Sequence, residues 1–344
     1  MSAAAEVMFH RSSPEQYILV QVTPEILDQE LFIKPVSSNS TVLCTNSSTY
    51  QLKDVQQSNS LLFLSSSAPE KLQVQGEAAS WLEAVLKLKP KIDLSCVPIF
   101  DGGQAIGVQG ITQDVLFSRL PASNAEIHGA LHKNLCINLH DGYVRLEPDY
   151  VLKLLKLLVD TIVAEGLDLN ALESNHVLKL TYEDNENQDV LAFLLDRFSV
   201  HTTKSEAAHA RTGIDGLEVA RYTGTATLSL HANSPIGTTR FAALWAQATP
   251  LPFQQYCKDF QILGGHYIQP VSTQIQYFAS DELSVDGKQR IVQLLDVKER
   301  WLESEMLPFL LELEGGQKVA QSLIMKHARK VKVGKTTFIE RRGK

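Results

Sequence analysis

Residues 316–344 read GQKVAQSLIMKHARKVKVGKTTFIERRGK, and they concentrate positive charge in one segment of the chain. From Lys326 onward, eight basic residues stand against one acid, Glu340. The 344-residue chain has a formal net charge of −7, so a net charge of +7 here leaves about −14 for the other 325 residues. An acidic body joined to a basic segment favours nucleic-acid contact through the basic segment.

The pattern within this segment predicts structure as well as charge. Apolar residues of 319–328 recur at three- and four-residue spacing, which predicts an amphipathic helix. Residues 331–333 and 336–340 are rich in β-branched side chains and flank the turn-like pair Gly334 and Lys335, which predicts a hairpin. A basic helix followed by a basic hairpin is the order of a winged helix, whose recognition helix and wing face phosphate. A solvated charged tail is the alternative, but it would have no use for an apolar stripe. The candidate DNA-binding residues are Lys326, Arg329, Lys330, Lys332, Lys335, Arg341 and Arg342.

Residues 334–337, GKTT, imitate the end of a nucleotide-binding phosphate loop. That loop needs glycine five residues before Gly334, where this chain has Arg329, and a helix after the threonine, where Phe338 and Ile339 predict a strand. We therefore expect no nucleotide site here.

The composition is that of a soluble globular protein, with 44% hydrophobic and 21% charged residues. The length suggests two to four domains. No apolar run approaches the ~18 residues that span a bilayer, and residues 1–16 lack the apolar region of a signal peptide, so we expect an intracellular protein. The cysteines are far apart and form no CxxC pair, which predicts neither disulfides nor a zinc site. They are Cys44, Cys96, Cys136 and Cys257.

Short strands separated by polar clusters are predicted before residue 110, at a spacing typical of a β-barrel or sandwich. They are expected at 16–22, 31–34, 40–44, 49–52 and 60–64. Residues 82–89 could form a strand or a helix, and the strand is favoured. Several strands are too apolar to face water, so the sheet is either a free-standing fold or an assembly module whose edge a partner covers.

Helical periodicity dominates beyond the glycine-rich residues 101–107. Helices are expected at 112–120, 123–133, 148–165, 176–182, 189–198, 239–247, 286–295, 303–313 and 317–330. Hairpin strands are expected within 135–146, and a strand at 225–230 after a polar loop, 201–216. The predicted architecture is α+β and multidomain, with an N-terminal partial β-barrel and three tandem winged-helix domains. The predicted domains are a β-barrel assembly domain at 1–110, a winged helix at 111–166, a second with an insertion at 167–280 and a basic third at 281–344.

Three groups of residues could form a metal-binding or base-binding site, and each has a simpler structural interpretation. His128 and His132 share a helix face, but no third metal ligand is evident, so a polar helix surface is favoured. An acidic cluster formed by Asp184, Glu186 and Asp189 lacks the glycine of a calcium loop. Trp301 lies beside an apolar helix stripe, which favours core packing over stacking on a base. We expect no catalytic residues, no metal and no cofactor.

Two segments carry a resemblance to a known family. Residues 41–64 resemble the N-terminal region of the DNA replication and sister chromatid cohesion protein Dcc family, especially VLC at 42–44 and TYQLK at 49–53. Residues 297–301, VKERW, and 323–337 are similar to that family's terminal winged helix. Shorter similarities lie at 95–100 and 165–169, and residues 201–240 have no match.

The resemblance implies a nuclear, non-catalytic subunit of the alternative, replication-factor-C-like clamp loader that loads PCNA. In that family an N-terminal barrel joins the small and large chromosome-transmission-fidelity subunits. The barrel and first winged helix contact the catalytic subunit of DNA polymerase epsilon, and later winged helices bind single- or double-stranded DNA. The alternative function is an assembly scaffold whose basic domain docks on an acidic protein surface.

Overall fold

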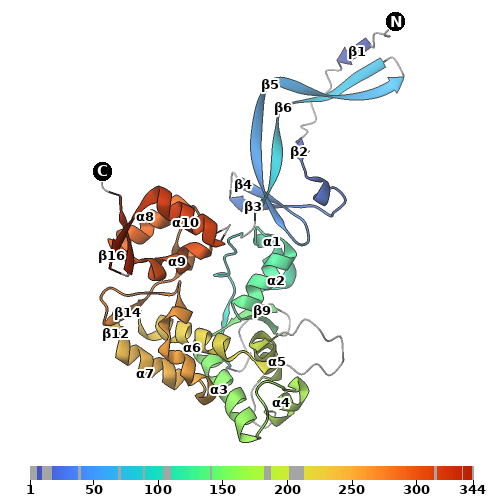
Figure 1. Ribbon diagram of the computed structural model, residues 1–344. Helices are drawn as coiled ribbons and strands as arrows, with labels where there is room; N and C mark the ends of the chain where they lie inside the picture. Colours follow the sequence, from blue (N-terminus) through green and yellow to red (C-terminus); the bar gives the residue numbers. More distant parts are fainter. Residues whose placement is uncertain are drawn as a thin grey trace. The chain divides into compact units, whose positions relative to one another are not determined.

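The computed structural model describes residues 6–9, 18–37, 40–68, 71–87, 90–103, 110–139, 142–181, 187–200, 213–313, 316–334 and 336–342. Two compact units make up the chain (Figure 1). Met1–Leu94 and Thr112–Leu131 form the first, and Ser95–Ile111 and His132–Lys344 form the second. Helices and several small sheets together confirm the predicted α+β class. The four-domain division stays a prediction.

The first unit is built on one sheet in the order β1-β6-β5-β4-β3, with β2 also paired to β6. Its edge strands β1 and β3 do not pair with each other, so the described strands form an open sheet and no closed barrel. Completion of a barrel by partners stays a prediction. The elements are β1 (Glu6–Phe9), β2 (Val20–Gln21), the 3-10 helix η1 (Pro24–Ile26), β3 (Phe32–Ser37), β4 (Ser40–Cys44), β5 (Thr49–Ala68), β6 (Lys71–Lys87), α1 (Gln113–Arg119) and α2 (Asn124–Lys133).

The long antiparallel pair of β5 and β6 corrects the sequence prediction. Residues 49–52 and 60–64 were expected to be separate strands, yet both belong to β5. The register runs from Thr49 opposite Lys87 to Ala68 opposite Lys71, with a shift after Gln56 that absorbs the polar residues between the two expected strands. The strand predicted at 82–89 is confirmed over 82–87, which form the end of β6, and residues 88–89 lie outside the described residues.

Polar contacts join α2 to the base of this sheet. Thr49 and Ser123 both donate their hydroxyls to the Glu126 carboxylate, and the Ser123 amide donates to Thr49 Oγ1 at 2.8 Å. Lys34 on β3 donates to the Ala122 carbonyl at 2.7 Å. The apolar core beside them is small, so these hydrogen bonds hold the helices and sheet together. Its buried residues are Ile26, Leu43, Tyr50 and Ala84.

Three small sheets of the second unit share one strand order. In β7-β9-β8, β12-β14-β13 and β15-β17-β16, the last strand of the three lies between the other two. The strands are β7 (Ile99–Phe100), β8 (Cys136–Leu139), β9 (Gly142–Leu146), β12 (Ile236–Gly237), β13 (Tyr267–Ile268), β14 (Gln274–Tyr277), β15 (Arg300–Leu302), β16 (Ala328–Val333) and β17 (Thr336–Arg341). A further pair joins β10 (Ser199–Val200) to β11 (Gly213–Ile214).

Helices cover these sheets and supply most of the core. The α-helices are α3 (Pro148–Ala164), α4 (Ser174–Leu180), α5 (Gln188–Arg197), α6 (Gly216–His231), α7 (Thr238–Ala248), α8 (Gly287–Val297), α9 (Glu303–Leu311) and α10 (Gly316–His327). The 3-10 helices are η3 (Leu251–Lys258), η4 (Phe260–Leu263) and η5 (Ser280–Glu282). Helix α3 begins with Pro148 at its first turn and buries one apolar stripe, as its spacing predicts. The helix predicted over 317–330 ends at His327, because residues 328–330 pair with β17.

The strand predicted at 225–230 is wrong, because these residues lie inside α6. Residues 225–230, TATLSL, contain the threonines and leucines of a typical strand. In the structure the buried Thr223 and Thr227 hydroxyls instead donate to the Ala220 and Thr223 carbonyls of the same helix. Gly224 lets α6 approach the indole of Trp245 closely. Packing thus outweighs the strand preference of the β-branched residues.

The basic end of the chain folds around its own core. The helix–strand–helix–helix–strand–strand order of α8, β15, α9, α10, β16 and β17 surrounds Trp301, Phe309, Ile324 and Ile339, each 0% exposed. Trp301 donates from Nε1 to the Leu294 carbonyl at 2.9 Å and packs edge-on against Phe309. The prediction that this tryptophan belongs to the core is confirmed.

Candidate nucleic-acid interface

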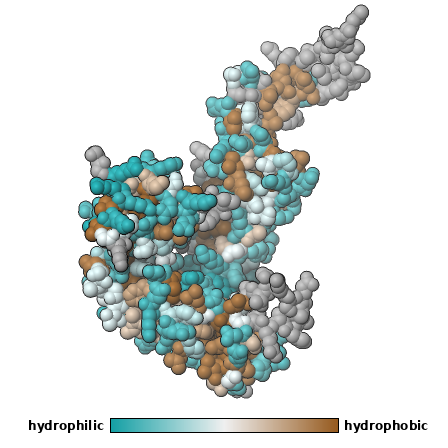
Figure 2. Space-filling view, in the orientation of Figure 1, coloured by the Kyte–Doolittle hydropathy of each residue, from teal (hydrophilic) through white to brown (hydrophobic). Residues whose placement is uncertain are grey.

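The exposed side of α10 carries basic side chains at helical spacing. Ala320 and Ile324 are fully buried, so the opposite side of the helix faces solvent. On that outward side Lys318, Lys326 and Met325 are exposed, Met325 by 64%. Figure 2 shows hydrophilic residues gathered over these C-terminal elements. Arg329 and Lys332 on β16 are exposed as well, and we call the four cations Lys318, Lys326, Arg329 and Lys332 the basic stripe.

Three members of the basic stripe come from the predicted set. Lys326, Arg329 and Lys332 are exposed, and within the described part of the chain no acidic side chain pairs with them. Their charges are therefore available to an outside anion.

Two other predicted residues already have acidic partners. Lys330 Nζ lies 2.6 Å from Glu303 Oε1 and 2.6 Å from Gln321 Oε1. The hydrogen bond from Lys330 lowers the pKa of the Glu303 carboxyl. Arg341 pairs with Asp296 at the end of α8. Both cations tie the hairpin to the helices, which reduces what they can offer to a phosphate.

Arg342 closes the C-terminal end of α10. Its guanidinium donates to the Met325 carbonyl and, from Nε, to the Ala328 carbonyl at 3.1 Å. A cation there satisfies carbonyls that the helix leaves open and complements the helix dipole. Lys335, the last predicted residue, lies outside the described residues.

Sequence reasoning missed two cations of this domain. Lys318 lies two helical turns before Lys326, so helical spacing alone places both on one side. Arg300 lies on β15, and its guanidinium carbon is 4.2 Å from the centroid of the Phe338 ring. The pairing of β15 with β17 brings these two residues together, and no local sequence signal shows it.

Residues 334–337, which resemble the end of a nucleotide-binding loop, include a hairpin turn and the start of a strand. Gly334 has φ +62° at the hairpin turn, a conformation that suits glycine. Thr336 then begins β17, whereas a phosphate loop needs a helix at that point.

Within the described residues, the other candidate site residues make contacts that stabilise the fold. His128 packs against the Phe117 ring, and His132 lies 3.2 Å from Asp196. Asp189 belongs to the first turn of α5, which Asn187 caps, whereas Asp184 and Glu186 lie outside the described residues. A search of the described residues finds no group of three or more metal-ligating acids, histidines or cysteines.

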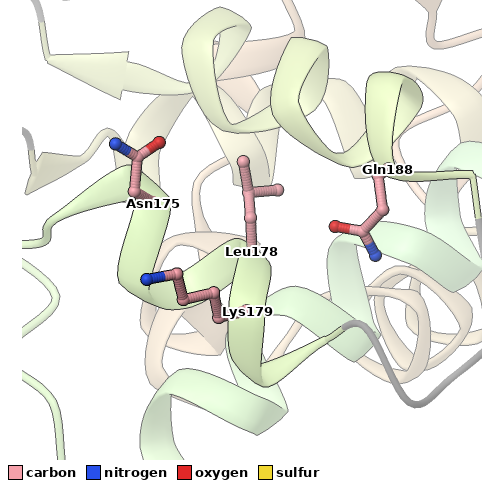
Figure 3. Close-up of a pocket in the computed structure, with 4 residues that line it drawn as sticks. All are labelled: Asn175, Leu178, Lys179 and Gln188. Carbon is pink, nitrogen blue, oxygen red and sulfur yellow. The ribbon is translucent and has the colours of Figure 1, made fainter.

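A pocket of about 490 Å³ lies between α4 and α5 (Figure 3). Asn175, Leu178, Lys179 and Gln188 line it. These four side chains offer two amides, one amine and one apolar chain, and they include no carboxylate, imidazole, thiol or hydroxyl group to act with the lysine.

Comparison with known proteins settles the family. The family described as "Sister chromatid cohesion protein Dcc1" matches residues 17–310. The chain belongs to the Dcc1 family. The Dcc1 match ends inside α9. Beyond it, α10 packs into the same core as α9, and β16 and β17 complete the sheet that β15 begins.

Individual Dcc1 proteins match over most of their length. "Sister chromatid cohesion protein DCC1" of Saccharomyces cerevisiae is 26% identical over 379 aligned positions, covering 96% of this chain and 98% of that protein. The Homo sapiens protein of the same name is 21% identical over 343 positions, covering 91% of this chain and 85% of that protein. The Danio rerio protein is 22% identical over 330 positions, covering 88% and 81%. Helices long and apolar enough to span a membrane were not found in the described residues of this Dcc1 family member.

Proposed function

We propose that this chain is a non-catalytic adaptor subunit of an alternative PCNA clamp loader, which acts in the nucleus in DNA replication and sister chromatid cohesion. It would hold the loader on DNA and link it to DNA polymerase epsilon. The observation that carries the DNA part is the basic stripe, because its exposed cations lack acidic partners in the described chain. Family membership supports the cohesion part.

The strand order supports winged helices as the DNA-binding units. In α8, β15, α9, α10, β16 and β17 the chain runs helix, strand, helix, helix and hairpin, with the first strand paired to the last. This is the order of a winged helix, in which α10 would be the recognition helix and the β16–β17 turn the wing. The same first–third–second order in the two other small sheets supports three such domains in tandem.

Cations spread along a helix and a hairpin suit contact with the phosphate backbone. Lysine is a mobile point charge that reads no base pattern by itself, so binding would be largely independent of sequence. Each phosphate contact releases counterions, and the affinity should fall steeply as salt rises.

A triple substitution tests the interface. Replacing Lys326, Arg329 and Lys332 by alanine should weaken DNA binding at least tenfold in low salt and reduce the slope of log affinity against log salt by about 2 to 3. Fluorescence anisotropy of the whole chain with a labelled duplex measures both quantities.

The control substitutes Lys53, Lys133 and Lys156, which are exposed elsewhere and give the same change of net charge. If the two triple variants bind DNA with equal affinity, the net charge of the chain determines DNA binding and the basic stripe is not the interface.

The long β5–β6 hairpin supports the assembly part of the proposal. Leu61, Leu62 and Leu64 on β5 are 41–46% exposed, and the compact core near the hairpin's base does not reach them. Figure 2 shows apolar residues gathered over this hairpin. Between Gln56 and Ser80 only the four residues of β1 pair with this hairpin among the described strands. So narrow a ribbon is marginally stable in water, and a partner that covers these leucines would stabilise it. We propose that the small and large chromosome-transmission-fidelity subunits do so.

Hydrogen exchange tests this assembly. In the chain alone, amides of residues 56–80 should exchange fast, and co-expression with the small partner subunit should slow them by at least tenfold. Amides of α3 serve as the internal control. Slow exchange of the hairpin in the chain alone would show that it needs no partner.

An assembly scaffold with a basic docking domain is the second candidate. Lys330 and Arg341 already bind the carboxylates of Glu303 and Asp296, which is the chemistry of an acidic protein surface. Competition separates the two functions. A DNA-binding domain should hold the chain on immobilised DNA until short duplex DNA displaces it. A basic domain that only docks on an acidic protein should not retain the chain on DNA at physiological salt.

A further inference from the structure

The terminal sheet has one side that the core does not cover. Residues directly opposite each other in a sheet point to the same side. Trp301, Ile339 and Lys330 form one such row, and it faces the core because Trp301 and Ile339 are fully buried. The neighbouring rows therefore point to the opposite side. We call that side the outer face, and its rows are Arg300–Glu340–Arg329 and Leu302–Phe338–Val331.

Arg300 lies over the Phe338 ring on the outer face. Its guanidinium carbon lies 4.2 Å from the centroid of the Phe338 ring, and its Nε lies 2.9 Å from Glu340 Oε1. The Arg300 side chain is nevertheless 49% exposed. The ring therefore covers part of the guanidinium, and solvent still reaches the rest of the side chain.

A fixed guanidinium plane above an aromatic ring is a stacking surface. Unpaired bases stack on arginine planes and aromatic rings, whereas bases inside a duplex are already stacked on one another. Arg329, in the same row as Arg300, is exposed and can contact the phosphate of the stacked nucleotide. Glu340 neutralises part of the charge of Arg300 and fixes its orientation.

We propose that the outer face, centred on Arg300 and Phe338, binds an unpaired base of single-stranded DNA. This inference rests on the proposed DNA-binding function and adds to it a second site, which shares only Arg329 with the basic stripe. The basic stripe would hold the phosphates of either form of DNA, and the outer face would select single strands.

The test uses the whole chain and two labelled probes at one salt concentration, a 20-nucleotide oligo-dT and a 20-base-pair duplex. Arg300→Lys keeps the charge but removes the plane, and Phe338→Leu keeps an apolar side chain but removes the ring. Each should weaken oligo-dT binding at least fivefold and change duplex binding less than twofold. Lys326→Ala is the comparison variant and should weaken both probes by a similar factor.

A second readout follows the stacking itself. A 2-aminopurine placed in the oligo-dT should lose fluorescence when the wild-type chain binds, and the loss should be smaller with Arg300→Lys. Arg300→Lys decides the question alone if Phe338→Leu unfolds, as judged by circular dichroism.

The outcomes separate the two proposals. A wild-type chain that binds neither probe overturns both the DNA function and the outer-face site. A chain that binds duplex only, or whose oligo-dT affinity is unchanged by Arg300→Lys, overturns the outer-face site and leaves the DNA function standing. Equal losses on both probes also overturn the site, because they show a charge effect without base stacking.

Discussion

Arg290 is a basic residue whose charge lies in the interior. It is 5% exposed and donates to the backbone carbonyls of Phe309 at 2.6 Å, Ser280 at 2.8 Å and Ser284 at 2.9 Å. Glu312 lies 3.5 Å from it. One guanidinium thus joins α8, α9 and the segment that precedes α8. Its fork of donors suits three carbonyls, which a lysine could not satisfy in the same geometry.

Replacing Arg290 by methionine should destabilise the C-terminal domain by about 3 kcal/mol, because buried carbonyls lose their donors. Hydrogen exchange of α8 and α9 peptides measures the loss. The matched control is Arg329→Met, which removes the same charge from an exposed position and should leave exchange unchanged. Equal exchange in both variants would contradict the structural role of Arg290.

The ion pair between Glu303 and Lys330 predicts a pH dependence. The pKa of Glu303 is lowered from its ordinary 4.5, chiefly by the hydrogen bond from Lys330. A lowered carboxyl pKa contributes stability that is present above the unfolded value of 4.5 and is lost as pH falls through the folded value. Lys330→Met should therefore raise the Glu303 pKa toward 4.5, as carbon-detected NMR titration can measure. An unchanged pKa would show that the pair does not form in solution.

At the scale of elements, tertiary contacts determine whether a segment rich in β-branched residues forms a strand or a helix. The hairpin of β16 and β17 could be predicted, since Gly334 marks its turn and the alternation on both sides is local. The helix at residues 225–230 could not be predicted, because α6 packs at Gly224 against Trp245 and Leu263, which are distant in sequence. The merging of two expected strands into β5 depends likewise on its pairing with β6.

Gly224 allows a direct test of the α6 packing. A Cβ at this position would lie 2.6 Å from Leu263 Cδ2 and 2.7 Å from the Trp245 ring. Gly224→Ala should therefore destabilise the α6–α7 region by about 1–3 kcal/mol, although alanine is the better helix former. Faster hydrogen exchange of α6 peptides would report it.

Gly129 on α2 is the matched control, because a Cβ there meets nothing within 4 Å. Gly129→Ala should stabilise its helix by about 0.4–1 kcal/mol. If both substitutions slow exchange, close packing at Gly224 is not the reason for glycine there.

At the scale of the whole molecule, the candidate DNA site was predictable as a region but not residue by residue. Charge and periodicity locate the basic end, yet they cannot tell Lys326, which has no acidic partner in the described chain, from Lys330, which pairs with Glu303 on another helix. Arg300 was missed because its neighbour Phe338 is distant in sequence. A partial β-barrel was predicted for the first unit, whereas its described strands form an open sheet with one long hairpin.

Removing residues 314–344 should unfold the rest of the C-terminal domain. The family match ends at residue 310, but β15 pairs with β17, and Ala320 and Ile324 pack in the same core as Trp301. In a chain that stops at Leu313, peptides of α8 and α9 should lose protection from hydrogen exchange, while those of α3 and α5 keep theirs. Retained protection in α8 and α9 would show that they fold without the last three elements.

The strand order of the three small sheets also bears on how the protein is made. In each sheet the middle strand is the last of the three to be synthesised. The first strand therefore has no pairing partner until the intervening helices and the last strand have left the ribosome. No domain of this kind can be completed one element at a time, because the contact that closes it joins its first and last strands. A pause in translation before any of these last strands would leave two unpaired strand edges exposed, and synonymous codons that slow the ribosome there should increase aggregation of the nascent chain.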